Sequence, residues 1–133
     1  MDTESFTGTW SYRSFVNNPD LDVDFDDLRF GAGTLTLHSP SLGRVAGTLG
    51  GSGWQLELKG AASYGNPFAC RLQGVGEIGG ETWVYDYVGY LTPWWPHGVN
   101  QVPAITGSVI RTVAHSNGQA EAGLVASFIA VRS

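Results

Sequence analysis

The sequence predicts an all-β fold, an eight-stranded antiparallel up-and-down β-barrel. Helical periodicity is almost absent, and glycine is frequent, with 19 residues in a chain of 133. Short runs of alternating apolar and polar residues are separated by turn residues, which is typical of antiparallel strands. Most connections are short, so each strand is expected to pair with its neighbours in sequence. Eight strands in this order close into a barrel without free edges, and a β-sandwich is the structural alternative.

Each expected strand is one of these runs. The fourth run is the clearest, because Trp54, Leu56 and Leu58 alternate with polar residues, so one face is expected to be buried and the other exposed to water. The connections GGSG and GGE on either side of the central strands are suited to tight hairpins. The expected strands cover residues 8–15, 28–37, 44–49, 53–60, 68–78, 81–91, 104–113 and 123–132.

The last strands differ from the others because both of their faces are apolar. Trp83, Tyr85 and Tyr87 lie on one face of their run, and the other face carries Val84 and Val88. A strand that is apolar on both sides is buried on both sides. We therefore expect the outer face to be covered by another domain or by another copy of the chain. The latter would be a homo-dimer or tetramer formed through strands 81–91, 104–113 and 123–132.

Size and charge limit the possible functions. The chain is expected to form a single domain over residues 1–133, with a net charge of −5 and only seven basic residues. This balance argues against nucleic acid and anionic membranes as partners. The beginning of the chain is acidic and polar, unlike a signal peptide, and the single Cys70 excludes an internal disulfide. We expect a cytoplasmic protein, although a secreted chain whose signal had been removed would look the same.

The acidic stretch of residues 17–27 carries aspartates at alternate positions from Asp20 onwards. A calcium loop of the EF-hand type starting there would need Gly at position 25 and Glu at 31, where the chain has Phe25 and Gly31. We expect no metal site. Instead, the alternation predicts a flap over the barrel mouth, with its apolar side chains, Leu21, Val23 and Phe25, pointing inward.

The connection of residues 92–103 is rich in proline and carries Trp94 and Trp95. These indoles are candidates to close the barrel floor, to cover a neighbour's pocket or to seal a dimer. His97 in the same loop is either an acid–base group or an inert loop histidine. His38 and His115 are expected in other turns, and nothing in the sequence pairs them for metal binding.

Gly8-Thr9-Trp10 opens the first expected strand, and a large indole at this place can plug one end of a barrel. In this motif and in strand number, the chain resembles the calycin barrels, which include the lipocalins, and most closely the avidins and streptavidin. The resemblance implies an avidin-like fold and a tendency to oligomerise. Avidins hold biotin with Asn and Ser on the first strand, a Tyr–Ser pair and several Trp residues. Apart from Ser14, this set has no convincing counterpart in the chain, so biotin binding is not implied.

The leading hypothesis is that the barrel binds a small, largely apolar or aromatic ligand. Such pockets combine an apolar wall with a few polar groups. We expect Tyr12 and Ser14 to supply polar contacts. The apolar wall is expected to consist of Trp54, Trp83, Tyr85, Tyr87 and Phe128. No cofactor is expected.

Two other function classes remain open. A barrel enzyme of the isomerase or cyclase type would move a proton with a Tyr, Asp or His, and Asp86 or His97 would be the group to titrate. Asp86 also fits a structural ion pair or a solvated place at a dimer rim. An accessory or oligomerisation domain of a larger bacterial protein would instead use the apolar outer strands. Cys70 is expected to be a small buried hydrophobe.

Overall fold

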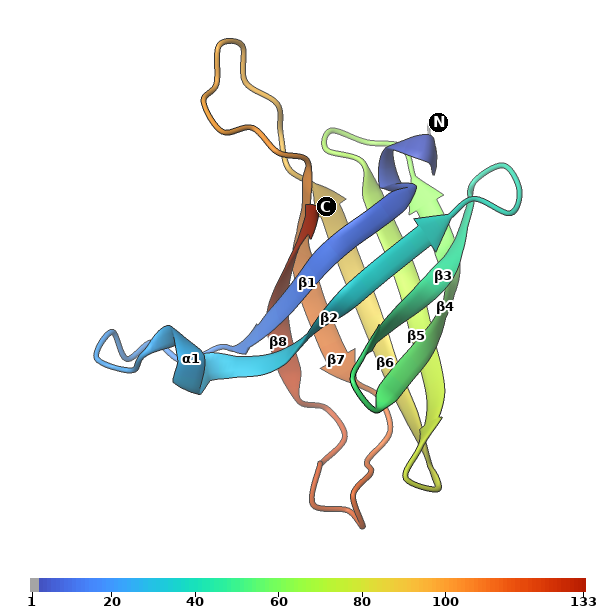
Figure 1. Ribbon diagram of the computed structural model, residues 1–133, viewed down its shortest axis with the longest axis vertical. Coiled ribbons are helices and arrows are strands. Elements are labelled where there is room, and N and C mark those ends of the chain that lie inside the picture. The colour runs from blue at the N-terminus through green and yellow to red at the C-terminus, as the bar shows by residue number, and fades with distance from the viewer. Residues whose placement is uncertain (1–2) are drawn as a thin grey trace.

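The computed structural model describes residues 3–133 and is a closed barrel in which each strand pairs antiparallel with its neighbours in sequence, β1 closing on β8 (Figure 1). This confirms the predicted fold class. A short 3-10 helix, η1 (Thr3–Phe6), precedes the barrel, and a single helical turn, α1 (Phe25–Leu28), precedes β2. The strands are β1 (Gly8–Val16), β2 (Arg29–His38), β3 (Arg44–Gly51), β4 (Trp54–Ser63), β5 (Ala69–Ile78), β6 (Glu81–Leu91), β7 (Ala104–Arg111) and β8 (Val125–Arg132).

The observed strands agree with the predicted ones to within three residues, and both ends of the connection between β7 and β8 differ by two. There the regular pairing stops at Arg111 and resumes at Val125. The intervening 112–124 loop folds back on itself through a small bridge between His115 and Ala120. Within the described chain, no helix is long and apolar enough to cross a membrane.

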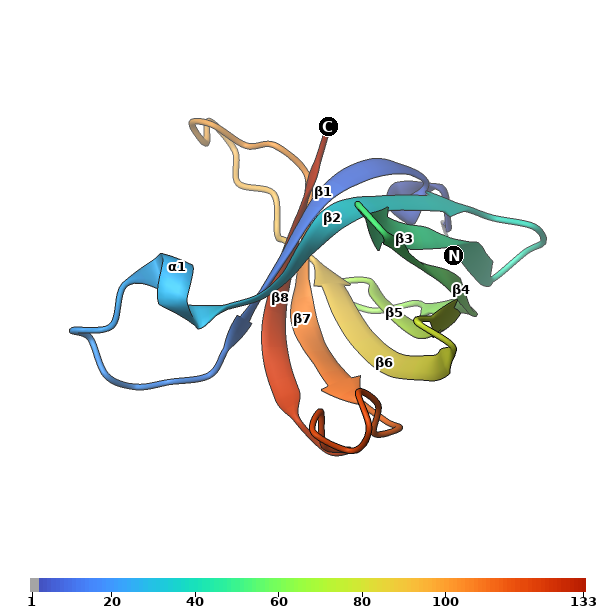
Figure 2. The ribbon, with the colours of Figure 1, turned by 60° about the horizontal axis from the view of Figure 1, so that its bottom comes forward.

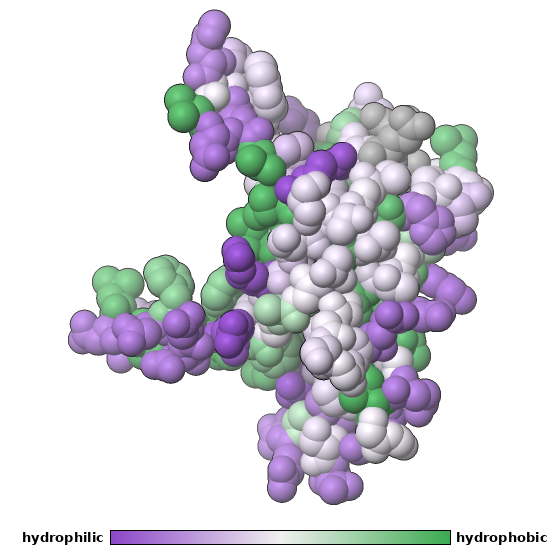
Figure 3. Space-filling model, in the orientation of Figure 1, coloured by the Kyte–Doolittle hydropathy of each residue, from purple (hydrophilic) through white to green (hydrophobic). Residues whose placement is uncertain are grey.

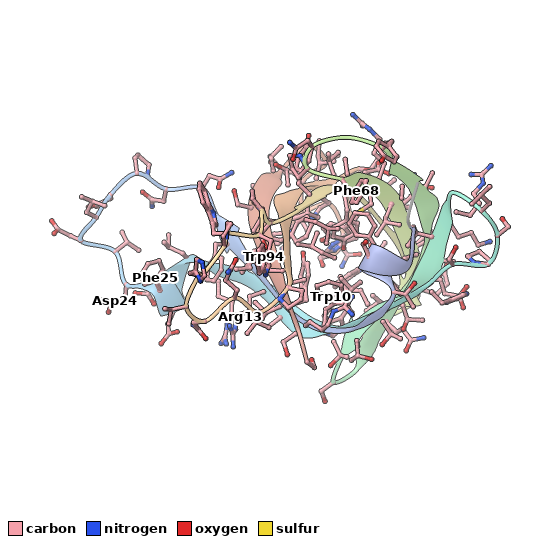
Figure 4. All side chains as sticks on the ribbon, turned by 90° about the horizontal axis from the view of Figure 1, so that it is seen from above. Trp10, Arg13, Asp24, Phe25, Phe68 and Trp94 are labelled. Carbon is pink, nitrogen blue, oxygen red and sulfur yellow. The ribbon has the colours of Figure 1, made fainter. Side chains whose placement is uncertain are left out.

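One end of the barrel is closed by aromatic side chains. Phe6 and Trp10 are completely buried, and the Trp10 indole donates a hydrogen bond to the Phe6 carbonyl oxygen at 3.1 Å. The Arg132 guanidinium lies over the Trp10 ring at 4.5 Å from its centroid. Figure 4 shows Trp10 directly beneath η1 at this end. The Gly-Thr-Trp opening therefore forms the plug that the sequence predicts.

A bulge distorts the pairing of β1 with β2 at the opposite end. Ser14 pairs with Gly31, but the next residue, Phe15, pairs with Arg29, so Phe30 has no partner across the strands. A bulge of this kind redirects a side chain and increases the local twist. Here the extra residue, Phe30, lines the barrel interior close to the open end.

The predicted flap of residues 17–27 does not cover the barrel. The segment projects sideways from the wall (Figures 1 and 2), and Leu21 and Phe25 are 98% and 79% exposed. Aspartate and asparagine side chains cap its turns instead, with Asn18 accepting from the Asp20 amide and Asp20 from the Asp22 amide. Because the segment forms turns rather than a strand, its alternating apolar residues do not share a face.

The 92–103 loop leaves the barrel at the closed end and does not form the floor. Trp94 and Trp95 are 73% and 69% exposed, and Figure 4 shows Trp94 outside the ring of strands. The floor role is therefore taken by Phe6 and Trp10. Gln101 ties the loop together, because its side chain exchanges two hydrogen bonds with the Trp95 backbone.

The outer surface is divided between a polar and a more apolar side. On β4 the outward residues Gln55, Glu57 and Lys59 are exposed, as predicted. On the opposite side β6, β7 and β8 present valine and isoleucine outward, including Ile110 at 37% and Val125 at 45% exposure. Figure 3 shows hydrophobic surface along the margin of the barrel where β8 runs in Figure 1.

Candidate functional site

The open end of the barrel contains a pocket of about 430 Å³. It lies at the end where β3 turns into β4 and β5 into β6, opposite the Trp10 plug. Its wall is predominantly apolar and aromatic, and it also includes the charged side chain of Arg111. The residues that line it are Tyr12, Ser14, Phe30, Gly31, Ala32, Leu49, Gly53, Trp54, Leu56, Ile78, Trp83, Tyr85, Tyr87, Val109, Arg111 and His115.

The structure brings nearly all of the predicted site residues together. Those that line the pocket are Tyr12, Ser14, Trp54, Trp83, Tyr85 and Tyr87. Phe128 lies deeper, in a narrow adjoining space of about 10 Å³, where its ring stacks on Tyr12 at 5.5 Å between centroids. A space of that size holds about one water molecule. The barrel is thus filled below Tyr12 and Tyr87 and hollow above them.

The inner end of the pocket carries hydroxyl groups in apolar surroundings. Burial raises the pKa of Tyr12 to about 12, although hydrogen bonding with Ser14 acts in the opposite direction. Burial also raises the pKa of Tyr87 well above its ordinary value. Both phenols are therefore neutral at physiological pH and can donate or accept hydrogen bonds. Ser14 is itself buried. Its hydroxyl donates to the Gly31 carbonyl oxygen at 3.4 Å, a distance at which a hydrogen bond is weak.

The mouth of the pocket is polar, and its groups are held by one another. The Arg111 Nε–H donates to the Tyr85 hydroxyl at 2.9 Å, and its Nη1 donates to the Glu121 carbonyl oxygen at 3.2 Å. The guanidinium also lies over the Phe30 ring, 5.2 Å from its centroid. Arg111 is therefore held at the opening by contacts with the 112–124 loop and with two aromatic rings.

His115 completes this group from the 112–124 loop. Its imidazole stacks on the Trp83 indole with 3.8 Å between centroids and 9° between planes. Its Nε2 is 2.8 Å from the Tyr85 hydroxyl, and its Nδ1 is 2.9 Å from the Ser116 hydroxyl. Burial, and secondly the charge of Arg111, lower the pKa of His115, while Glu81 acts in the opposite direction. The neutral imidazole is therefore favoured.

One arrangement of protons that satisfies these contacts together is the following. Tyr85 accepts from Arg111 and donates to Nε2 of a neutral His115, whose Nδ1–H then donates to Ser116. The result is a hydrogen-bonded series that runs across the mouth from cation to phenol to imidazole. Such a series can hold a polar ligand group or transfer a proton.

Glu81 places His115 in the wall. The Glu81 carboxylate, at the start of β6, accepts hydrogen bonds from the backbone amides of Ser116 and Asn117 at 3.0 and 3.2 Å. These two residues and Gly118 have positive φ angles, as a tight turn requires. The carboxylate thus holds the turn against β6. Because His115 lies next to this turn, its imidazole is placed over the Trp83 indole.

Sequence reasoning missed His115, Arg111 and Phe30 as pocket residues. Phe30 enters through a bulge, which leaves no clear mark in the sequence. Arg111 and His115 lie at the end of a strand and in a loop, where alternation gives no guide. The Ser-Asn-Gly run at positions 116–118 was the available signal, because Asn-Gly favours a tight hairpin that would fold the loop back.

The other polar candidates lie elsewhere. Asp86 faces outward from β6, where Gln73 and Thr112 donate hydrogen bonds to it, so its partners are neutral rather than cationic. His97 lies in the exposed 92–103 loop at the closed end. Neither residue lines the pocket. Cys70 is a buried thiol, as predicted, and burial raises its pKa to about 12. Residues 3–133 contain no group of three acidic, His or Cys side chains that could hold a metal ion.

Comparison with protein-family models, curated proteins and solved structures found no match to this chain.

Proposed function

We propose that the protein is a binding barrel that encloses a small, largely apolar or aromatic molecule in the pocket at its open end. The observation that supports this most is the hollow itself. A pocket of about 430 Å³ lies within the usual range for small-molecule sites, roughly 300–1,000 Å³. Protein interiors are otherwise close-packed, and the remainder of this barrel obeys that rule.

The test is a fluorescence titration with N-phenyl-1-naphthylamine, a neutral aromatic probe that emits strongly in apolar surroundings. We compare the wild type with Leu56→Trp, which puts an indole into the pocket wall, and with Gln55→Trp, which puts the same group on the outer face of β4. Wild type and Gln55→Trp should bind the probe, and Leu56→Trp should bind it about tenfold or more weakly.

A Leu56→Trp protein that binds as tightly as the wild type would contradict the proposal, as would a wild type that does not bind. Ile78→Trp repeats the test at the pocket rim, where the side chain is only half-buried, so the larger indole disturbs core packing less than it does at Leu56. Circular dichroism of each variant verifies that the barrel has folded.

An avidin-like assignment within the calycins is part of this proposal. Its support is the barrel, the Gly-Thr-Trp opening and the plug formed by Trp10. The ligand is not expected to be biotin, because the pocket wall offers Ser14, Tyr12 and Tyr87 but no asparagine.

A proton-transfer enzyme is the second candidate, and the Tyr85–His115 hydrogen bond inside the pocket favours it. These two residues, rather than Asp86 or His97, would then move the proton. Incubating the protein with its co-purified ligand in deuterium oxide distinguishes the classes. An isomerase or cyclase that protonates carbon would add deuterium to the ligand, and His115→Gln would abolish the incorporation. A binding protein would return the ligand unlabelled.

A second copy of the chain is the partner we propose for the outer face of β6, β7 and β8. This face carries Val88, Ile110, Val125 and Ile129, with few charges. Val125→Lys should shift the protein to monomer in sedimentation equilibrium. Thr34→Lys, on the exposed outer face of β2, is the matched control and should leave the oligomer intact. A wild type that sediments as a monomer would refute the proposed interface.

A further inference from the structure

The charge at the pocket mouth indicates which end of a ligand lies there. The chain carries 12 acidic and 7 basic residues, yet the pocket wall contains Arg111 and no aspartate or glutamate. The Glu81 carboxylate, which lies against the turn that carries His115, accepts hydrogen bonds from the backbone amides of Ser116 and Asn117. The mouth is therefore a local cationic site in an acidic protein.

Arg111 retains unused hydrogen-bonding capacity. Its Nε and Nη1 donate to Tyr85 and to the Glu121 carbonyl oxygen. Across the described chain, Nη2 has no acceptor and the guanidinium has no carboxylate partner. Arginine presents a planar fork of donors that fits an oxyanion, and such charge-assisted hydrogen bonds are about twice as strong as neutral ones.

The guanidinium is also already held in place. Phe30 and Tyr85 lie beneath it at 5.2 and 5.7 Å, and the Glu121 carbonyl fixes its outer edge. A side chain that is ordered before binding loses little further entropy when a ligand arrives. The side chain is half-buried, so water screens its charge less than it would on an open surface.

We infer that the ligand is an amphipathic acid: its apolar or aromatic body fills the pocket, and its terminal oxyanion, a carboxylate or a group of like geometry, binds Arg111 at the mouth. This inference rests on the proposed function and adds the chemical class of the ligand. Tyr85 acts as a positioning residue, since it accepts a hydrogen bond from Arg111, and His115 acts through its hydrogen bond to Tyr85.

A pair of matched probes tests the inference. 8-Anilinonaphthalene-1-sulfonate has the same aromatic body as N-phenyl-1-naphthylamine and adds one sulfonate. The wild type should bind the anionic probe about tenfold or more tightly than the neutral one, as expected for a hydrogen bond to a charged group. Arg111→Gln should lose this preference and keep its affinity for the neutral probe. Arg111→Lys, which retains the charge, should keep part of the preference.

Arg71→Gln is the control, because it removes a cation from the exposed outer face of β5. It should bind both probes as the wild type does. The inference is overturned if the wild type does not prefer the anionic probe, or if Arg111→Gln weakens both probes equally. In either case binding of the neutral probe by the wild type leaves the proposed function standing. Failure of both probes to bind the wild type refutes the proposed function as well.

Discussion

At the scale of single residues, the pocket mouth depends on three side chains that hold one another through hydrogen bonds. Tyr85 bridges Arg111 and His115, and the indole of Trp83 supports the imidazole from below. Tyr85 therefore links the positions of Arg111 and His115. Protonation of that imidazole would place a second cation beside the guanidinium.

The lowered pKa of His115 predicts a loss of stability on mild acidification. The unfolded chain binds a proton near pH 6.5, while the folded chain resists it because of burial and Arg111. The stabilising contribution is thus complete above about pH 6.5 and is lost as the pH falls through the lower, folded-state pKa. Urea unfolding at pH 7.5 and 5.5 should show a smaller drop in the free energy of unfolding for His115→Gln than for the wild type.

His38→Gln controls this experiment, because it removes an exposed histidine at the other end of the barrel. It should retain the wild-type pH dependence. Identical pH dependence in the wild type and His115→Gln would show that His115 is not linked to folding in this range.

Trp10 carries the largest packing contribution that we can assign to one residue. It is completely buried, its indole donates a hydrogen bond to the Phe6 carbonyl oxygen, and the Arg132 guanidinium lies over its ring. Trp10→Ala should lower the free energy of unfolding by about 3–5 kcal/mol, since it leaves a cavity at the closed end. Trp94→Ala removes an indole that is 73% exposed and should change it by less than about 0.5 kcal/mol. Denaturant titrations that give similar values for both would contradict the assigned plug.

At the scale of elements, the strands were predictable and the longer loops were not. Alternation places Leu56 and Leu58 inside and Lys59 outside without reference to the remainder of the chain, because side chains alternate along every strand. The same alternation misled at Leu21, where it occurs in a chain segment that forms turns. A period-two pattern predicts a shared face only where the backbone is extended.

The candidate site divides in the same way. The strand residues Tyr12, Tyr85 and Tyr87 could be predicted, because strand alternation alone points them inward. The polar mouth could not, because it depends on where the 112–124 loop meets the barrel. That meeting is fixed by Glu81 binding two amides far along the chain, a contact that sequence periodicity does not encode.

The 17–27 loop offers a test at this scale. It lines no part of the pocket, and its contacts with the barrel include an edge contact between Phe25 and Phe15 and a hydrogen bond from Ser127 to Asn17. Replacing residues 19–26 with a short Gly-Ser turn should leave the affinity for N-phenyl-1-naphthylamine within about twofold, because shortening a surface loop costs little closure entropy. A large loss of affinity would mean that the loop does close over the mouth when a ligand binds.

At the scale of the whole molecule, the barrel is asymmetric along its axis and around its wall. One end is plugged by Trp10, while the other holds a pocket with a cation at its rim. One side of the wall is polar, and the side formed by β6 to β8 is more apolar. We thus propose that the inside of the barrel holds a ligand and that one outer side contacts a second copy of the chain.

Native mass spectrometry of freshly purified protein, followed by denaturation of the same sample, shows whether the barrel holds a ligand. The folded wild-type chain should carry the mass of a small molecule and release it on denaturation. Leu56→Trp, whose pocket is filled, should carry none. Spectra in which the wild type and Leu56→Trp both show only the bare chain would contradict the proposed function, because the wild-type pocket would then hold no ligand.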